Sequence, residues 1–270
     1  MKNILNAPFM VETVRMLTNL YRLGWDERNG GNLSYLLHEE DLEGYLDTSK
    51  VIRTIPMSFE AYDLVGKIFI VTGTGKYFKN VQYDPETNLG IIRIAKDARS
   101  CELLWGYKDG GRFTSELPAH LMSHMIRLKA DPEHRVVMHS HPTNTIAMSL
   151  ILGPSEREFT RALWKMQTES IVVFPEGVGV LPWMVCGTND IGVATAKKLR
   201  DTRLCVWTTH GIYGTGKDLD EAFGLIETVE KAAQLYMLTV GQERKNEIKD
   251  DELRDLAAVF GLDYKKEYLD

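Results

Sequence analysis

Runs of residues typical of buried strands are interleaved irregularly with helical patterns along the chain, and this order limits the possible folds more than any single motif does. Short runs rich in β-branched and apolar residues predict strands at 33–37, 67–72, 89–95, 101–107, 135–141, 170–175, 179–181 and 204–208. Amphipathic spacing and capping residues predict helices at 11–23, 114–129, 144–152, 156–167, 190–200, from Asp218 onward, and around 252–260. The order lacks the regular strand–helix alternation of a barrel or a dinucleotide-binding fold. We therefore expect one domain, residues 1–270, in which helices cover a mixed sheet.

Local capping residues and turns refine these expectations. The strands at 89–95 and 101–107 are expected to form a hairpin. A hydroxyl cap at Thr114 and a proline at 118 predict the start of a helix, and Asp218 with Glu221 forms the pattern of a capping box. Residues 38–66 are polar and irregular, and a charged extension begins at about residue 242.

Charge and cysteine usage exclude several classes of protein. The net charge of -6 offers no general attraction to nucleic acid, so an anionic ligand would need a local site. The sequence has no run of about 18 apolar residues, the length needed to span a membrane. Residues 1–10 also lack the apolar segment of a signal peptide. Cys101, Cys186 and Cys205 are far apart and form no CxxC pair, as expected of reduced thiols in a cytoplasmic protein.

Two histidines at the end of one predicted strand are the sharpest chemical feature. On a strand, residues i and i+2 point to the same face, so His139 and His141 direct two imidazoles at one point. His210 follows another predicted buried strand and precedes a glycine. If both strand ends meet, the three residues form the ligand set of a catalytic zinc site with one open position. From spacing alone, the alternative that they are ordinary hydrogen-bonded histidines stays open.

A second possible metal site lies on the helix predicted after Thr114. Glu116, His120 and His124 recur at i, i+4 and i+8, so their side chains share one helix face. They could be ligands, or an acidic first-turn residue followed by two partly buried histidines. A third interpretation divides the roles, with Glu116 facing the zinc as a base and the two histidines structural.

Glycine-rich turns suggest sites for a phosphate group. The turns at 29–32 (Asn-Gly-Gly-Asn) and 73–76 (Gly-Thr-Gly-Lys) both offer exposed backbone N–H groups, although most such turns only reverse the chain. Residues 211–217 match half of a nucleotide-binding P-loop. Asp218 stands where that motif needs Ser or Thr for magnesium, so we reject nucleotide binding there.

Seven segments in this order resemble the class II aldolase family, which includes L-fuculose-phosphate aldolase, ribulose-phosphate 4-epimerase and the adducin head. The resemblance covers about residues 1–240, and its segments are GWDERNGGNL at 24–33, IVTGTGK at 70–76, TSELPAH at 114–120, MHSH at 138–141, VVFPEGVG at 172–179, LPWM at 181–184 and HG at 210–211. The chain departs from the family mainly at 38–67 and after residue 241.

The resemblance implies an α/β fold with three α/β/α layers around a mixed, mostly antiparallel sheet, and a homotetramer with active sites between subunits. It implies one zinc ion per subunit on His139, His141 and His210, with Glu116 as the catalytic acid/base. Glu169 matches a carboxylate that reaches a neighbouring subunit's site. The phosphate of a small phosphorylated ketose is expected among residues of the two turns and the helix start: Asn29, Gly30, Gly31, Asn32, Gly73, Thr74, Gly75, Thr114 and Ser115.

Several activities are compatible with these residues. The family resemblance favours an aldolase acting on a phosphorylated ketose. A 4-epimerase of the same fold would share the zinc and the phosphate turns but release no fragments. A hydrolase could use three histidines to activate water. A non-catalytic module, as in adducin, is disfavoured because the three histidines and Glu116 are all present.

Overall fold

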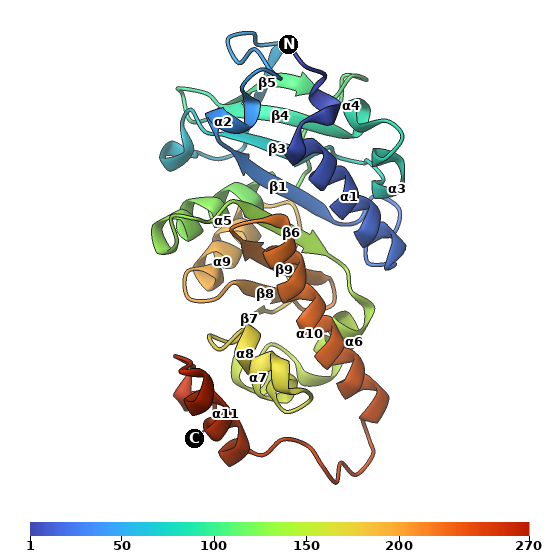
Figure 1. The fold of residues 1–270 in the computed structure, drawn as a ribbon, viewed down its shortest axis with the longest axis vertical. Coiled ribbons are helices and arrows are strands. Elements are labelled where there is room, and N and C mark those ends of the chain that lie inside the picture. Colours follow the sequence, from blue (N-terminus) through green and yellow to red (C-terminus); the bar gives the residue numbers. More distant parts are fainter. Residues whose placement is uncertain (270) are drawn as a thin grey trace.

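The computed structural model describes residues 1–269. A nine-stranded sheet forms the middle layer of the fold (Figure 1). The strand order is β2-β5-β4-β3-β1-β6-β9-β8-β7, and among the described strands every neighbouring pair is antiparallel except β7–β8. The strands are β1 (Asn32–Leu37), β2 (Arg53–Pro56), β3 (Ile68–Thr72), β4 (Leu89–Ile94), β5 (Ser100–Gly106), β6 (Val136–Ser140), β7 (Gly179–Leu181), β8 (Leu204–Trp207) and β9 (Gly211–Gly216).

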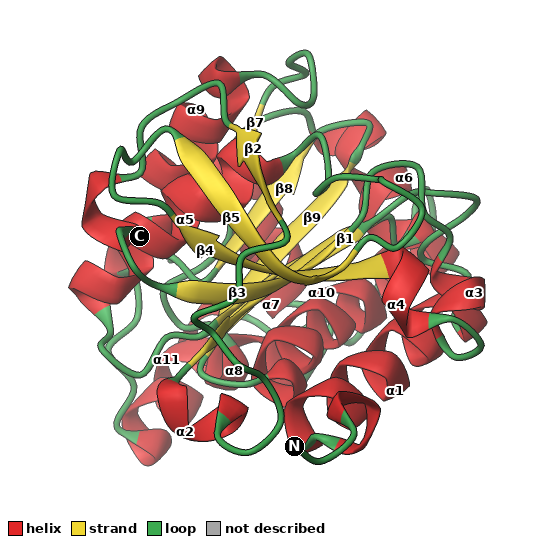
Figure 2. Cartoon of the chain, turned by 90° about the horizontal axis from the view of Figure 1, so that it is seen from above, coloured by secondary structure: helices red, strands yellow, loops and turns green. Residues whose placement is uncertain are grey.

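Helices cover both faces of this sheet, which confirms the expected three-layer α/β/α fold with a mixed, mostly antiparallel sheet (Figure 2). The helices are α1 (Pro8–Arg22), α2 (Glu39–Leu42), α3 (Phe78–Val81), α4 (Pro85–Asn88), α5 (Leu117–Ala130), α6 (Thr143–Leu152), α7 (Glu156–Trp164), α8 (Thr168–Val173), α9 (Asn189–Leu199), α10 (Leu219–Thr239) and α11 (Asp250–Phe260). Three short 3-10 helices lie at Ile4–Asn6, Tyr62–Leu64 and Lys266–Tyr268. None of the described helices is both long and apolar enough to cross a membrane.

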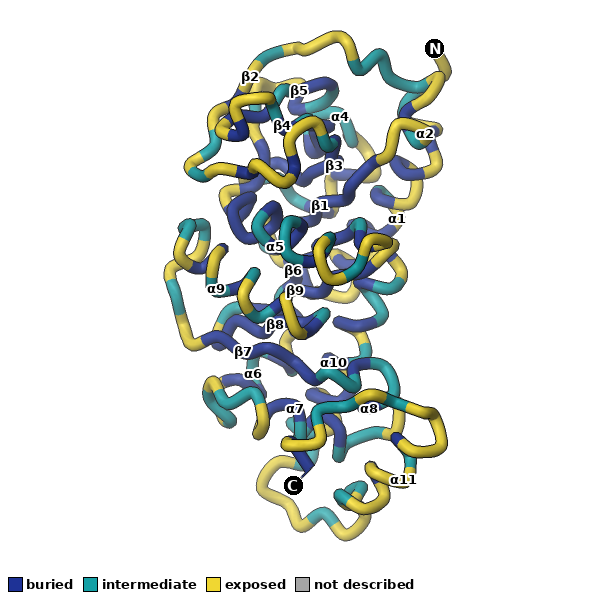
Figure 3. Tube along the Cα trace, turned by 90° about the vertical axis from the view of Figure 1, so that its left-hand side faces the viewer, coloured by how far each residue is buried: buried dark blue, intermediate teal, exposed yellow. Residues whose placement is uncertain are grey.

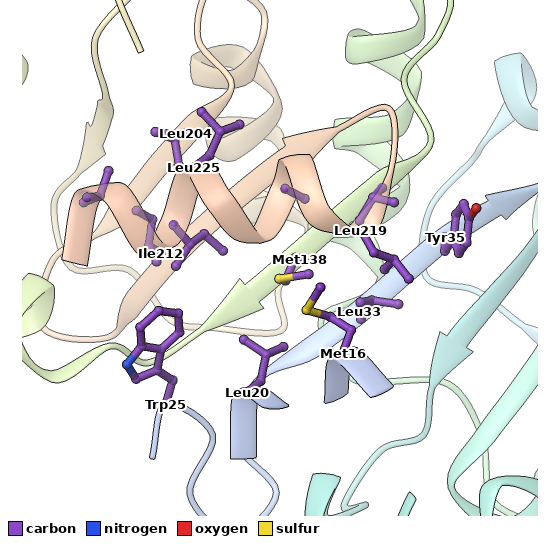
Figure 4. Packing of buried hydrophobic residues seen from close by; sticks show 14 of the residues in the cluster. Met16, Leu20, Trp25, Leu33, Tyr35, Met138, Leu204, Ile212, Leu219 and Leu225 are labelled. Atoms are coloured by element: carbon purple, nitrogen blue, oxygen red, sulfur yellow. The ribbon is translucent and has the colours of Figure 1, made fainter. Parts of the chain in front are cut away.

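Alternating side chains on the strands divide the core between the two faces. Leu33 and Tyr35 of β1 pack with α1 and α10, as the close view of this cluster shows (Figure 4), and Leu37 belongs to the same cluster. Leu36, between them, points to the opposite face and packs with α5. Ser34 is buried on that same face, because alternate residues of a strand share a side. The face of the sheet that α5 covers therefore carries the buried polar residue Ser34.

Most of the predicted elements are confirmed within a few residues, including the hairpin of β4 and β5, α1 and α11. Asp218 caps α10 as expected by accepting a hydrogen bond from the Glu221 backbone N–H at 2.7 Å. The Glu221 carboxylate, however, accepts from the Lys217 N–H rather than from that of Asp218. Figure 3 shows the exposed connection from α10 to α11 within the charged end of the chain.

The strand predicted at 170–175 is wrong, because the chain forms α8 over Thr168–Val173. Its β-branched run Ile171-Val172-Val173 is typical of a strand, but a short apolar run does not distinguish a strand from a buried helical turn. Ile171 is buried in the core shared with α10. Tertiary packing outweighs the local propensity here.

Strand β9 was not predicted, because the glycines of residues 211–217 were considered only as part of a loop that matches half of a P-loop. The structure explains two of the three glycines of β9 by the close packing of α10 on the strand. A Cβ at Gly214 would lie 2.7 Å from Ile226 Cγ1, and one at Gly216 would lie 2.8 Å from the Ala222 nitrogen. Glycine in a strand often marks such a close approach.

The helix start predicted at Thr114 is also wrong by three residues. Helix α5 begins at Leu117, and Glu116 occupies the N-cap position with φ -89° and ψ 13°. The Thr114 hydroxyl instead accepts a hydrogen bond from the Glu116 backbone N–H at 3.2 Å. This small turn holds Glu116 at the end of the helix, beside the strand ends that carry the histidines.

Candidate active site

Three histidines meet where β6 ends and β9 begins. His139 lies on β6, His141 directly follows that strand, and His210 lies in the turn between β8 and β9. The antiparallel pairing of β6 with β9 brings these chain segments together. Ring centroids are 5.0 Å apart for His139–His141, 5.1 Å for His139–His210 and 5.0 Å for His141–His210. The structure therefore brings the three histidines predicted from the sequence into one cluster.

The hydrogen bonds around this cluster leave two imidazole lone pairs facing each other. His139 Nδ1 lies 3.0 Å from the Ile212 carbonyl and donates to it, so His139 Nε2 carries no proton. His141 Nδ1 lies 3.2 Å from the Glu27 carboxylate, an acceptor that favours the tautomer with the proton on Nδ1 and Nε2 free for a ligand bond. These two Nε2 atoms are 3.2 Å apart. With both Nδ1 atoms as donors, the two Nε2 lone pairs converge with His210 on one position, and this donor set fits a divalent metal ion.

Burial keeps the central histidine in the neutral form that a metal needs. His139 is fully buried, and burial together with His141 and His210 holds its pKa well below the usual value. The pKa of His210 is also lowered by burial, although the nearby Glu116 carboxylate opposes this effect. Neutral imidazole is the ligand form of histidine.

The Glu116 carboxylate faces the histidine cluster. Its Oε2 lies 3.6 Å from His139 Nε2, and its Oε1 lies 3.8 Å from His210 Nε2. Oε2 accepts hydrogen bonds from Asn32 Nδ2 at 3.0 Å and from the Tyr213 hydroxyl at 2.8 Å. The Tyr213 ring stacks on His139 with centroids 4.4 Å apart. Two donors thus hold Oε2, whereas Oε1 accepts no hydrogen bond from the described residues.

The second set considered from the sequence does not converge on a metal position. Both ring nitrogens of His120 are hydrogen bonded, one to Ser34 and one to Asn32. Both ring nitrogens of His124 are also engaged, with Ser34 and His134. Neither imidazole has a free nitrogen, so this helix face matches the third interpretation, in which Glu116 faces the metal and the histidines are structural.

Part of the expected phosphate site forms one cavity at the start of α5. Thr74, Thr114 and Ser115 line it together with Arg112 and Gly187. The turn after β3 is joined to this segment because the Thr74 N–H donates to the Arg112 carbonyl at 2.9 Å. Arg112 was missed in the sequence, where the only available indication was a basic residue two positions before Thr114. It gives the cavity a cationic side chain suited to a phosphate.

The other expected phosphate turn, residues 29–32, lies at the histidines. A Cβ on Gly30 would be 2.8 Å from His141 Nδ1, so the glycine backbone packs directly against that ligand. Asn29 is exposed on the turn. The Asn32 side chain is buried and has partners at both ends, Glu116 and His120. Asn32 therefore contacts the Glu116 carboxylate, while Gly73 and Gly75 accompany Thr74 in the other turn.

A buried aspartate lies beneath the 29–32 turn. Asp26 is 1% exposed, and its carboxyl oxygens make no hydrogen bond of good geometry, although the Ser140 side chain lies close enough to lower the pKa. Burial, and secondly the neighbouring Glu27, outweigh this effect and raise the pKa of Asp26 well above the usual value. Gly31, at φ +70°, passes so close that a Cβ there would lie 1.6 Å from Asp26 Oδ1. The turn can take this path only with glycine at position 31.

Two further residues complete the description of the site. Cys186 is exposed, and its sulfur lies within 4.8 Å of ligand atoms of Glu116 and His210. Glu169 lies on α8, where it is exposed, and Figure 1 shows α8 beyond the β7 edge of the sheet. The structure does not bring Glu169 together with the histidine cluster of its own chain.

Comparisons with known proteins agree with this geometry. Residues 11–237 match the family described as class II aldolase and adducin N-terminal domain. The chain is 56% identical over 269 residues to a rhamnulose-1-phosphate aldolase of Listeria monocytogenes, covering 99% of this chain and 98% of the relative. It is 55% identical to a rhamnulose-1-phosphate aldolase of Enterococcus faecalis, covering 99% and 96%. A crystal structure of a sugar-phosphate aldolase from Thermotoga maritima has a TM-score of 0.74 at 28% identity, covering 87% of this chain and 97% of that one.

Proposed function

Because the chain belongs to the class II aldolase and adducin N-terminal domain family, we propose that it is a zinc-dependent aldolase that cleaves L-rhamnulose 1-phosphate into dihydroxyacetone phosphate and L-lactaldehyde. The observation that carries this proposal is 55–56% identity, over nearly the full length, to proteins named rhamnulose-1-phosphate aldolase. The three histidines and Glu116 support it, because that reaction needs a metal and an acid/base group side by side.

The cleavage leaves negative charge on C3 of the dihydroxyacetone phosphate half, and the chain offers two groups that manage it. His139, His141 and His210 would hold the metal, which supplies Lewis-acid stabilisation of negative charge when bound. Glu116 would move the proton at C3, accepting it in the synthetic direction and returning it after cleavage. Its Oε1 is the oxygen for this step, because Oε2 is occupied by Asn32 and Tyr213.

The substrate phosphate would lie in the cavity at the start of α5. Thr74, Thr114 and Ser115 offer hydroxyl and backbone donors there, and Arg112 adds a positive charge. A local cation and several donors explain how a protein of net charge -6 could bind an anionic sugar. Asn29, at the tip of the neighbouring turn, would meet the phosphate from the metal side.

A homotetramer would complete the site. Glu169 is exposed on α8 and distant from the histidines of its own chain in the fold, so it could serve only a neighbouring subunit's site, at the aldehyde end. Cys101, Cys186 and Cys205 are all free thiols, which supports a cytoplasmic location for such an enzyme of sugar metabolism.

The test is cleavage of L-rhamnulose 1-phosphate, followed by enzymatic reduction of the dihydroxyacetone phosphate formed. We expect chelation to abolish turnover and zinc to restore it. Replacing Glu116 with Gln should lower the rate on the order of 10²- to 10⁴-fold, the usual range for one acid/base group. Near-normal turnover of Glu116→Gln would exclude this role for the residue.

The same assay separates the alternatives. A zinc-loaded protein that releases no dihydroxyacetone phosphate from this sugar would be tested on L-fuculose 1-phosphate. Interconversion of phosphopentoses without fragments would identify a 4-epimerase, and cleavage of esters would identify a hydrolase.

A further inference from the structure

A continuous chain of buried side chains runs from the Glu116 carboxylate into the interface between β1 and α5. Asn32 Nδ2 lies 3.0 Å from Glu116 Oε2, and Asn32 Oδ1 contacts His120 Nε2. His120 Nδ1 and His124 Nε2 each lie 2.8 Å from the Ser34 hydroxyl. The chain ends where His134 Nε2 lies 2.9 Å from His124 Nδ1. Every member is at most 7% exposed, and Ser34, His120 and His124 are fully buried.

The chemistry of these groups allows only one set of donor directions when Glu116 is ionised. The carboxylate can only accept, so Asn32 turns its NH2 toward it and its carbonyl oxygen toward His120. His120 must then donate from Nε2, which leaves Nδ1 as an acceptor for the Ser34 hydroxyl proton.

The same reasoning fixes the remaining two histidines. Ser34 has used its one proton on His120, so its oxygen accepts from His124 Nε2. His124 Nδ1 in turn accepts from His134 Nε2. All three histidines therefore carry their proton on Nε2, and all five hydrogen bonds point toward Glu116.

Burial keeps these histidines neutral, as this pattern requires. It lowers the pKa of His120 and of His134 to about 3, and that of His124 well below the usual value. Each imidazole therefore has one N–H and one lone pair, and a change of tautomer at any of them would leave a donor facing a donor or an acceptor facing an acceptor.

This series of hydrogen bonds cannot serve as a proton wire, because the Asn32 amide cannot take up a proton on one side and release it on the other. What it can do is hold the amide in one of its two flipped orientations. A flipped Asn32 would direct its oxygen at the Glu116 carboxylate and replace an attraction with a repulsion. Consecutive hydrogen bonds also polarise one another, which strengthens the bond that reaches Glu116.

We propose that His120, Ser34, His124 and His134 are positioning residues, which fix the Asn32 amide so that it orients the Glu116 carboxylate for proton transfer. This proposal rests on the proposed role of Glu116 as the acid/base group. It assigns a function to the His120 and His124 pair, which the metal site leaves unexplained.

The first test replaces Ser34 with Ala and measures hydrogen exchange at C3 of dihydroxyacetone phosphate in heavy water without an aldehyde. In the proposed mechanism this partial reaction uses Glu116 and the metal and needs no aldehyde. One charge-assisted hydrogen bond misdirected at the carboxylate predicts a loss of about 10- to 100-fold. The KM for dihydroxyacetone phosphate and the zinc content should stay within about twofold of the parent, since no ligand of either is touched.

Matched variants separate positioning from folding. Ser123 is equally buried on α5, but among the described residues its hydroxyl bonds only to the Ala119 carbonyl of its own helix, so Ser123→Ala should retain the exchange rate. Ser34→Thr keeps the hydroxyl and should recover most of the activity lost in Ser34→Ala. Exchange in folded, zinc-loaded Ser34→Ala at the parent rate would overturn the proposal.

A second measurement needs no variant of Ser34 and no turnover. Nitrogen-15 NMR of the histidine rings in the zinc-loaded protein should show Nε2–H tautomers for His120, His124 and His134. A proton on Nδ1 of His120 or His124 would overturn the donor directions. If the tautomers are as stated but the wild type fails to exchange the C3 proton, the proposed aldolase function fails and the network stands.

Discussion

Gly31 is the residue whose replacement tests the local packing of the site most directly. A Cβ at this position would lie 1.6 Å from Asp26 Oδ1 and 3.1 Å from the His139 carbonyl oxygen, and the backbone is at φ +70°. Asp26 is 1% exposed, so its carboxyl group cannot turn into solvent. Gly31→Ala must therefore move the turn that covers His141 and carries Asn32.

The expected cost has two parts. A left-handed backbone conformation costs a non-glycine residue about 1–2 kcal/mol, and an overpacked contact adds about 1–3 kcal/mol. Gly44→Ala is the matched control, because Gly44 has φ +77° but nothing within 4 Å of its Cβ position. It should lose only the backbone part. At about 2–4 °C per kcal/mol, Gly31→Ala should lower the apparent melting temperature by about 10 °C, and Gly44→Ala by about 4 °C.

The contact can be assigned by a double-mutant cycle measured by thermal unfolding, with aldol cleavage assayed in parallel. Asp26→Ala alone should change the stability little, because it removes a buried carboxyl that makes no hydrogen bond of good geometry. Combined with Gly31→Ala it should recover about 1–3 kcal/mol. If Gly31→Ala behaves like Gly44→Ala, or if Asp26→Ala gives no recovery, the steric account is refuted.

Three further changes test other parts of the site. Tyr213→Phe removes a 2.8 Å hydrogen bond to Glu116 but keeps the aromatic ring, so kcat should fall about 10-fold or more at constant zinc content. Arg112→Ala should raise the KM for the phosphorylated substrate about 10-fold and leave kcat within about twofold; an unchanged KM would remove Arg112 from the phosphate site. Partial desolvation of the Cys186 sulfur, and secondly the Glu116 charge, raise the pKa of this exposed thiol, so the reactive thiolate is scarce at neutral pH. Iodoacetamide should therefore inactivate the enzyme slowly, and the inactivation rate should rise with pH. Dihydroxyacetone phosphate should protect the enzyme, and the Cys186→Ser variant should resist inactivation. Equal inactivation of that variant would contradict the placement of the thiol beside the site.

The local pattern of the sequence was sufficient for the parts of the site that depend on neighbours along the chain. His139 and His141 share a face because strand geometry alternates side chains, whatever the strand packs against. Asp218 caps α10 because a capping hydrogen bond is made within one turn. The family resemblance then added what spacing left open, namely that His210 belongs with the other two histidines.

Contacts between distant segments could not be predicted in this way. The strand at 170–175 was wrong and β9 was missed because packing against α10 decides both, through Ile171 in the core and the glycines that admit the helix. Tyr213 could be placed on Glu116 only once β9 was known to pair with β6.

The hydrogen bonds around Glu116 show most clearly what local sequence pattern can predict and what only the folded structure decides. The spacing of His120 and His124 indicated a shared helix face, but not what that face meets. Ser34 on β1 lies 86 residues from His120 along the chain, and only the folded sheet places its hydroxyl between the two imidazoles. A hydrogen bond depends on an approach of about 3 Å, and such an approach between remote segments is decided by the tertiary structure alone.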